Sequence, residues 1–209
     1  MINVYYTRSV QKLNAEIFSH FFQQLPPPIQ NKISKFRNWE DSQRCLLGNA
    51  LLIRGLEFLG LTYSLNNLKY TEYKRPFFDD LIDFNISHSG EYIICAISTT
   101  NKVGVDVEKM KDIPINNFKN IFSDEEWNNV STDKSLRSFY TYWTKKEAFL
   151  KAIGTGMNIP LKNITIPGNK IVWENREWFL EEIKLDKDYL SHVSSDTDSL
   201  EIAIEKLDF

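Results

Sequence analysis

Three carboxylates and a lysine lie in two short segments of this 209-residue chain. The first segment, Gly104-Val-Asp-Val-Glu108, has the alternation of a β-strand. Because successive side chains on a strand point to opposite faces, Asp106 and Glu108 share one face, and Gly104 leaves room on it. Adjacent carboxylates repel each other, and a cation between them removes that cost. The pattern indicates a cation site, although a solvated, half-exposed strand shows the same alternation.

The second segment runs from Trp143 to Gly154 and predicts a helix. A spacing of four residues places Glu147 and Lys151 one turn apart on the same side of that helix. Magnesium prefers oxygen ligands and is usually held by a few carboxylates together with substrate phosphates. The three carboxylates and Lys151 therefore suit a magnesium-bound diphosphate. An exposed i, i+4 ion pair is the alternative interpretation of the helical pair.

A third segment, Phe84-Asn-Ile-Ser-His88-Ser-Gly90, precedes the apolar run from Tyr92 to Ile97. The polar cluster is expected in the turn that enters this buried strand. Its hydroxyls, imidazole and backbone N–H groups could all bind phosphate oxygens. Taken alone, the segment is equally typical of a loop with a hydrogen-bonded histidine, so only its combination with the two acidic segments points to a phosphate ligand.

Six stretches of the sequence occur in a fixed order that matches one protein family. They span residues 39 to 156 and are Trp39-Glu-Asp-Ser-Gln-Arg44-Cys-Leu-Leu-Gly48, Tyr73-Lys-Arg-Pro76, Phe84-Asn-Ile-Ser-His-Ser89, Gly104-Val-Asp-Val-Glu108, Phe122-Ser-Asp-Glu-Glu126 and Trp143-Thr-Lys-Lys-Glu-Ala148. In these stretches the chain resembles the 4′-phosphopantetheinyl transferases of the longer, monomeric type.

The resemblance implies an α+β fold with two similar α/β halves related by a pseudo-twofold axis. We expect an N-terminal half of residues 1–102 that binds coenzyme A, and a C-terminal half of residues 103–209 that carries the metal ligands and catalytic residues. The implied reaction moves the 4′-phosphopantetheine arm of coenzyme A to a serine of an acyl or peptidyl carrier protein. It depends on magnesium and releases adenosine 3′,5′-bisphosphate.

The family's functional residues map onto this sequence one by one. The implied magnesium ligands are Asp106, Glu108 and Glu147. Glu147 is also a candidate general base, and Lys151 would neutralise charge on the departing phosphate. The residues implied to contact coenzyme A are Arg44, Ser87, His88 and Lys151. Glu126, in the match Phe-Ser-x-x-Glu, is implied to act in catalysis.

Two further contacts rest on stretches where this chain departs from the family pattern. Tyr73-Lys-Arg-Pro76 replaces the usual Tyr-Gly-Lys-Pro, so Arg75 is expected where a lysine meets the adenine region. Lys32 is the candidate for a basic residue at the 3′-phosphate. The carrier protein is expected to dock on residues 109–122, where Lys109, Lys111 and Lys119 alternate with apolar side chains.

Composition excludes several other classes of protein. With 42% hydrophobic residues and a formal net charge of −3, the chain can bury a sizeable core but gives no electrostatic reason to expect nucleic-acid binding. The sequence shows neither a signal peptide nor a membrane span, and two cysteines in apolar stretches favour reduced thiols. We therefore expect a cytoplasmic monomer without nucleic-acid or membrane partners.

Two alternative functions share the same residues. One is a coenzyme-A-binding protein that no longer transfers, which predicts the loss of a catalytic residue. The other is a magnesium-dependent diphosphate hydrolase, in which water replaces the carrier serine as nucleophile. Coenzyme A incubated with magnesium but without a carrier protein would be consumed by the hydrolase and left intact by the transferase.

Overall fold

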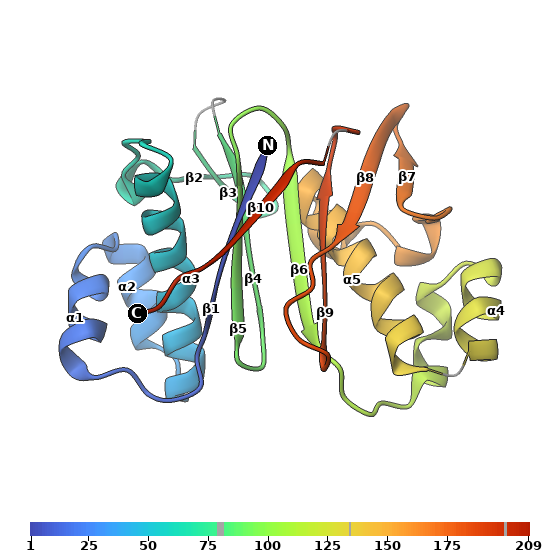
Figure 1. Cartoon of the computed structure of the whole chain (residues 1–209), viewed down its shortest axis with the longest axis horizontal. Helices are drawn as coiled ribbons and strands as arrows, with labels where there is room; N and C mark the ends of the chain where they lie inside the picture. The colour runs from blue at the N-terminus through green and yellow to red at the C-terminus, as the bar shows by residue number, and fades with distance from the viewer. Residues whose placement is uncertain (79–81, 134, 199) are drawn as a thin grey trace.

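Two four-stranded sheets face each other at the centre of the protein, and helices cover their outer faces (Figure 1). The computed structural model describes residues 1–78, 82–133, 135–198 and 200–209. Helices α1 to α3 lie outside the first sheet, and α5 lies outside the second. This arrangement confirms the predicted α+β class with two α/β halves, while their pseudo-twofold relation stays a prediction.

The first sheet has the strand order β10-β1-β5-β4, with β10 parallel to β1 and the other pairs antiparallel. Its strands are β1 (Ile2–Arg8), β4 (Asp83–Ser89), β5 (Tyr92–Ser98) and β10 (Ile202–Lys206). Its helices are α1 (Ala15–Gln23), α2 (Pro27–Ser34) and α3 (Trp39–Phe58). The side chain of Asn14 caps the N-terminus of α1. Helix α2 begins with Pro27 and Pro28, because the N–H that proline lacks would have no partner in the first turn of a helix.

The second sheet has the order β6-β9-β8-β7, and every pair is antiparallel. Its strands are β6 (Val103–Lys109), β7 (Lys170–Trp173), β8 (Arg176–Glu182) and β9 (Tyr189–Ser195). Its helices are α4 (Asp124–Asp133) and α5 (Leu136–Ile153). Shorter elements are the pair β2 (Lys69–Tyr70) and β3 (Pro76–Phe77) and the 3-10 helices Leu65–Asn67, Ile115–Ile121, Gly156–Asn158 and Leu161–Asn163. No helix of the described residues has the length and apolar character needed to cross a membrane.

Strand β5 explains how the two sheets share a core. Ile93 and Ile97 pack on α3, whereas Ile94 and Ala96 face the second sheet together with the valines of β6. Both faces of β5 are therefore buried, which accounts for its uninterrupted apolar run.

Two strands differ from the expectations. The polar cluster around His88 lies in strand β4 rather than in a turn, and the turn is limited to Gly90 and Glu91. Its polar residues alternate with Phe84 and Ile86, a period-two pattern that also fits an edge strand. The last strand, β10, belongs to the first sheet, so the chain after residue 102 does not form one contiguous half.

His192 of β9 is almost completely buried, with 2% of its surface exposed. Thr144 donates its hydroxyl to Tyr140 O at 2.7 Å, so His192 Nδ1–H donates to Thr144 Oγ1, also at 2.7 Å. Burial, followed by the positive charges of Lys145 and Arg137, lowers the pKa of His192 to about 3. The ring is therefore neutral in the folded protein.

Acid should weaken the fold through this histidine. Below about pH 6.5, His192 becomes protonated in the unfolded chain, whereas in the folded chain it stays neutral until about pH 3. The free energy of unfolding should fall over that window by up to about 1.4 kcal/mol per pH unit. We expect His192→Gln to flatten this dependence in urea unfolding between pH 7 and pH 4.5. An unchanged slope would assign the acid sensitivity to other groups.

Candidate active site

Gly104 lets helix α5 lie directly on the carboxylate face of β6. A Cβ atom at this position would lie 2.1 Å from Ala148 O and 2.3 Å from Ala152 N, so any larger residue would push the helix away. The close approach brings Glu147 and Lys151, one turn apart on α5, to the acids of β6. The room expected at residue 104 is filled by the backbone of this helix.

The predicted acids and lysine meet at this contact. Lys151 Nζ lies 2.6 Å from Asp106 Oδ1 and 2.8 Å from Ser87 Oγ, and Ser87 also donates to Asp106 Oδ1 at 2.9 Å. Ser89 Oγ donates to Glu108 Oε2 at 2.6 Å. Residues from β4, β6 and α5 thus form one polar cluster, which we call the acid cluster: Ser87, Ser89, Asp106, Glu108, Glu147 and Lys151.

The charges of the cluster are incompletely neutralised. Burial, and then the negative charge of Asp106, raise the pKa of Glu147 to about 7 against the opposing effect of Lys151. Burial also raises the pKa of Glu108, whereas the hydrogen bond from Ser89 lowers it. Three carboxylates therefore stand close enough to repel one another, with one lysine among them.

The carboxylates of the acid cluster are the kind of ligand that magnesium prefers, although they are not arranged around a common point. Asp106 Oδ2 and Glu147 Oε1 are buried and have no hydrogen-bond partner among the described residues. In that part of the chain, no group of three or more His, Cys, Asp or Glu side chains is arranged to hold a metal ion as it stands. Lys151 engages one oxygen of Asp106, and Ser89 engages one oxygen of Glu108, so each carboxylate is held through a single oxygen.

A cavity of about 570 Å³ runs along the other face of β4, between that strand, α2, α3 and the β2–β3 hairpin. Its lining includes four basic residues: Lys32, Arg44, Lys74 and His88. Apolar side chains such as Leu68 and Pro76 line the rest. A cationic cavity with an apolar wall suits a nucleotide that carries phosphates.

His88 connects the cavity with the acid cluster. It lies between Ser87 and Ser89 on β4, and its side chain points to the opposite face. Partial burial, then the positive charges of Arg44 and Lys151, lower the pKa of His88. Arg44 is held by Asp41 at 2.6 Å and by Gly90 O at 3.1 Å. A phosphate placed near His88 would therefore lie close to three basic side chains, those of His88, Arg44 and Lys151.

Arg75 does not line this cavity. Its guanidinium forms a bidentate pair with Asp83 at 2.7 and 2.8 Å and donates to Lys151 O at 2.8 Å and Val103 O at 3.0 Å. The neighbouring Lys74, at φ +63°, lines the cavity instead. Sequence reasoning missed Lys74 because the motif match assigned the contact to the next residue.

Glu126 lies outside the acid cluster, in a buried ion pair. Its Oε2 accepts from Lys146 Nζ at 2.6 Å and from Ser123 N at 2.9 Å, and Ser123 Oγ accepts from Glu126 N. This reciprocal pair is a capping box at the start of α4. Lys146 also donates to Leu161 O and Ile121 O. The observed contacts of Glu126 are structural.

The expected docking segment, 109–122, packs on the core through its apolar side chains. Met110, Ile113, Ile115 and Phe118 lie against a cluster that includes Phe139. Lys111 and Lys119 remain exposed. The apolar side chains of this segment therefore stabilise the C-terminal half, and only Lys111 and Lys119 of its predicted docking residues are exposed.

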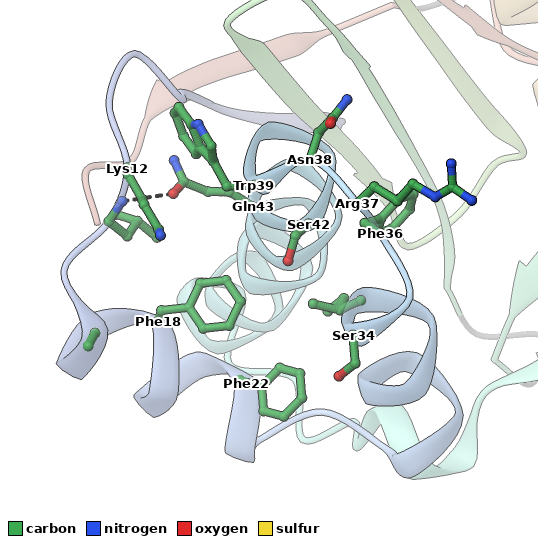
Figure 2. A pocket seen from close by; sticks show the side chains of 13 residues that line it. Lys12, Phe18, Phe22, Ser34, Phe36, Arg37, Asn38, Trp39, Ser42 and Gln43 are labelled. Atoms are coloured by element: carbon green, nitrogen blue, oxygen red, sulfur yellow. Dashed lines mark hydrogen bonds between the residues drawn. The ribbon is translucent and has the colours of Figure 1, made fainter.

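A larger cavity, of about 660 Å³, lies away from the acid cluster between α1, α2 and the start of α3. Figure 2 shows the rings of Phe18 and Phe22 pointing into it from α1. Its described lining residues include no carboxylate and none of the predicted site residues. Size alone therefore does not identify the reactive site.

Comparisons with known proteins cover almost the whole chain. The model of the 4′-phosphopantetheinyl transferase superfamily matches residues 102–204, and that of 4′-phosphopantetheinyl transferase, N-terminal, matches residues 13–100. The chain is 33% identical over 175 residues to the 4′-phosphopantetheinyl transferase gsp of Aneurinibacillus migulanus, with 81% of this chain and 73% of the relative covered.

Two other relatives agree. The 4′-phosphopantetheinyl transferase Sfp of Bacillus subtilis is 32% identical over 170 residues, which cover 78% of this chain and 74% of the relative. The L-aminoadipate-semialdehyde dehydrogenase-phosphopantetheinyl transferase of Xenopus laevis is 28% identical over 198 residues, covering 78% of this chain and 65% of the relative. Three of the six motifs meet in the acid cluster beside a cationic cavity, and the chain belongs to the 4′-phosphopantetheinyl transferase superfamily.

Proposed function

We propose that this protein transfers the 4′-phosphopantetheine arm of coenzyme A to a serine of an acyl or peptidyl carrier protein. The proposal rests on one observation above all. Two buried carboxylate oxygens, on Asp106 and Glu147, have no hydrogen-bond partner among the residues that the structure describes, and they lie beside Lys151 at the contact between the halves. The cationic cavity on the other face of β4 supplies a place for the nucleotide.

The cavity is proposed to bind the phosphorylated adenosine of coenzyme A. Lys32 and Arg44 would neutralise the 3′-phosphate, and Lys74 would face the adenine region in place of Arg75. The diphosphate would pass His88 at the edge strand β4 and reach the acid cluster. Ser87, whose hydroxyl already contacts both Lys151 and Asp106, lies at that crossing.

Asp106, Glu108 and Glu147 are the proposed ligands for magnesium. When bound there, magnesium would neutralise the diphosphate and polarise its phosphorus–oxygen bonds. The ligand set is supported by the partnerless oxygens and by the mutual repulsion of the acids.

The transfer step needs a proton acceptor and a stabilised leaving group. Glu147, through the carboxylate oxygen that does not hold the cation, would take the proton of the carrier serine as the serine oxygen bonds to the phosphorus of the pantetheine phosphate. The bond between that phosphorus and the bridging oxygen breaks, and adenosine 3′,5′-bisphosphate leaves with the electron pair. Lys151 would stabilise the charge on the departing phosphate.

Mass spectrometry of a panel of apo carrier proteins tests this function. After incubation with coenzyme A and magnesium, at least one carrier should gain the mass of one 4′-phosphopantetheine group. Coenzyme A should stay intact when every carrier is left out. Loss of coenzyme A without a carrier would instead favour the diphosphate hydrolase.

His88→Ala should weaken the use of coenzyme A more than it slows the reaction at saturation. A hydrogen bond to a charged phosphate contributes about 1.5 to 3 kcal/mol, so KM for coenzyme A should rise about tenfold or more. Because the contact is made equally before and during transfer, kcat should change little. A large drop in kcat at unchanged KM would make His88 an acid or base in the reaction.

The carrier protein is proposed to dock beside the acid cluster, on residues 109–122. Lys111 and Lys119 are exposed there, and Lys109 lies over the ring of Tyr189. An acidic carrier would be steered to these charges even though the whole chain is slightly negative.

Reversal of both charges, Lys111→Glu with Lys119→Glu, should raise KM for the carrier several-fold and weaken its salt dependence. KM for coenzyme A should stay constant. The matched control reverses Lys12 and Lys206, two exposed lysines outside the segment, and should change neither value. Equal behaviour of the two double variants would place carrier docking elsewhere.

We also propose that the protein works as a cytoplasmic monomer without nucleic-acid or membrane partners. Free thiols at Cys45 and Cys95 support a reducing compartment. Light scattering of the purified protein, with and without coenzyme A, tests the monomer.

A further inference from the structure

Strands β4 and β6 are joined through side chains rather than through a backbone ladder. Each strand stands at the edge of its own sheet, with β4 paired to β5 and β6 paired to β9. An edge strand carries backbone N–H groups that need other partners when buried. On β6, the side chains of β4 supply those partners.

Alternate residues of β4 form four rungs of this side-chain ladder. Each of these side chains accepts one hydrogen bond from a backbone N–H of β6, and the donors are every second residue of that strand. The rungs are Val103 N to Asp83 Oδ2 (2.8 Å), Val105 N to Asn85 Oδ1 (3.0 Å), Val107 N to Ser87 Oγ (3.4 Å) and Lys109 N to Ser89 Oγ (3.1 Å). The ladder therefore fixes which residue of β4 stands opposite each residue of β6.

The side chains of β4 that form the ladder change in type next to Asp106 and Glu108. An ionised carboxylate or an amide oxygen can only accept, and these occupy the first two rungs, Asp83 and Asn85. The last two rungs are serines, whose hydroxyls accept from β6 and still donate a proton. Ser87 donates to Asp106, and Ser89 donates to Glu108 Oε2 at 2.6 Å.

We propose that Ser89 is a positioning residue, which holds the Glu108 carboxylate in the orientation that magnesium binding requires. The inference rests on the proposed function. It assigns a role to Ser89, the residue after His88, to which the sequence motif gave none. Glu108 lies near the end of β6 and is only partly buried, and apart from Ser89 only Trp143 among the described residues is seen to hydrogen-bond its carboxylate, so loss of Ser89 would leave its three side-chain torsions less constrained. Fixing them in advance lowers the entropy lost on binding a ligand.

The turn after Ser89 holds the serine itself in place. Gly90 has φ +55°, the position that a two-residue type II′ hairpin gives to glycine. The next residue, Glu91, donates its N–H to the Tyr189 hydroxyl at 3.1 Å, which ties the hairpin to β9. A Cβ atom at residue 90 would lie 2.4 Å from that hydroxyl. Ser89 is therefore anchored to both sheets and can impose its position on Glu108.

The test compares two lost rungs, of which only one touches an acid. Ser89→Ala removes a rung together with one hydrogen bond to the Glu108 carboxylate, whereas Asn85→Ala removes a rung that contacts no carboxylate. Ser89→Thr keeps the hydroxyl. Magnesium chloride is titrated by calorimetry into each full-length protein saturated with coenzyme A, and coenzyme A binding without magnesium is measured separately. Thermal unfolding reports how much each lost rung costs the fold.

We expect Ser89→Ala to weaken magnesium binding about tenfold, as is usual when the partner of a metal ligand is removed. Asn85→Ala should bind magnesium like the wild type even if it melts at a lower temperature, and Ser89→Thr should restore the affinity. Coenzyme A affinity without magnesium should be the same for Ser89→Ala and the wild type.

Equal magnesium affinities of Ser89→Ala and Asn85→Ala would overturn the proposal, because the ladder would then act only on stability. So would a failure of Ser89→Thr to restore binding while it folds normally. Absence of transfer by the wild type, with these magnesium differences intact, would contradict the proposed reaction but not the role of Ser89.

Discussion

Asp106→Asn is expected to lower kcat/KM for transfer by about a thousandfold. Loss of the ligand charge removes several kcal/mol of stabilisation from a transition state that concentrates negative charge, and each 1.36 kcal/mol corresponds to a factor of ten. The same change also weakens the hold on Lys151, which lies 2.6 Å from Asp106 Oδ1. Formation of holo carrier protein, measured by mass spectrometry over a range of coenzyme A concentrations, gives the ratio.

The fold of this variant should survive. Asparagine keeps the shape of the side chain, and relief of repulsion from Glu147 and Glu108 offsets the lost attraction to Lys151. The melting temperature without magnesium should therefore change little. Asp188→Asn, at an exposed acid just before β9 and outside the docking segment, is the matched control and should transfer normally. Near wild-type transfer by Asp106→Asn at limiting magnesium would remove Asp106 from the site.

Gly104→Ala should damage both stability and transfer, because the new methyl group would occupy the place of the α5 backbone. Contacts of 2.1 Å to Ala148 O and 2.3 Å to Ala152 N cannot be relieved by rotating a side chain. Overpacking of a core costs about 1 to 3 kcal/mol or more, and we expect the upper part of that range. Displacement of α5 would also carry Glu147 and Lys151 away from Asp106.

Gly48→Ala offers a comparison at another buried glycine. Its Cβ would meet only side chains, Ile86 Cγ2 at 2.9 Å and Ile93 Cγ2 at 3.7 Å. A methyl group can shift, and alanine gains about 1 kcal/mol in helix propensity over glycine. Urea unfolding should therefore show a much smaller loss than for Gly104→Ala. Equal losses would mean that the approach of α5 to β6 is not the special constraint proposed for residue 104.

Local periodicity was sufficient to predict which acids share a face of β6 and that Glu147 and Lys151 share a face of α5, but not the part that Ser89 plays in the acid cluster. The period of two in β6 and the spacing of four in α5 fix which side chains share a face, and Gly104 marks the face on which another element can approach. These statements need only the geometry of a single strand or helix. The six ordered motifs supplied the fold and the pairing of the halves, which local patterns alone do not contain.

Hydrogen-bond partners outside a single strand or helix could not be predicted from local patterns. Arg75 pairs with Asp83 across a segment whose path the sequence does not predict, and the motif match pointed to coenzyme A instead. Glu126 forms a capping box, which its Ser-x-x-Glu spacing could have signalled. The alternation along β4 indicates a strand, but no pattern in it tells which N–H groups its polar side chains will bind.

The central claim is that magnesium, coenzyme A and a carrier serine react at one site formed by both halves. Its most direct test follows coenzyme A consumed and holo carrier formed in the same reaction, with and without magnesium. We predict equal amounts of both with magnesium, neither without it, and no loss of coenzyme A when the carrier is omitted. Consumption of coenzyme A without a carrier, or transfer that persists after magnesium is removed by chelation, would contradict the account.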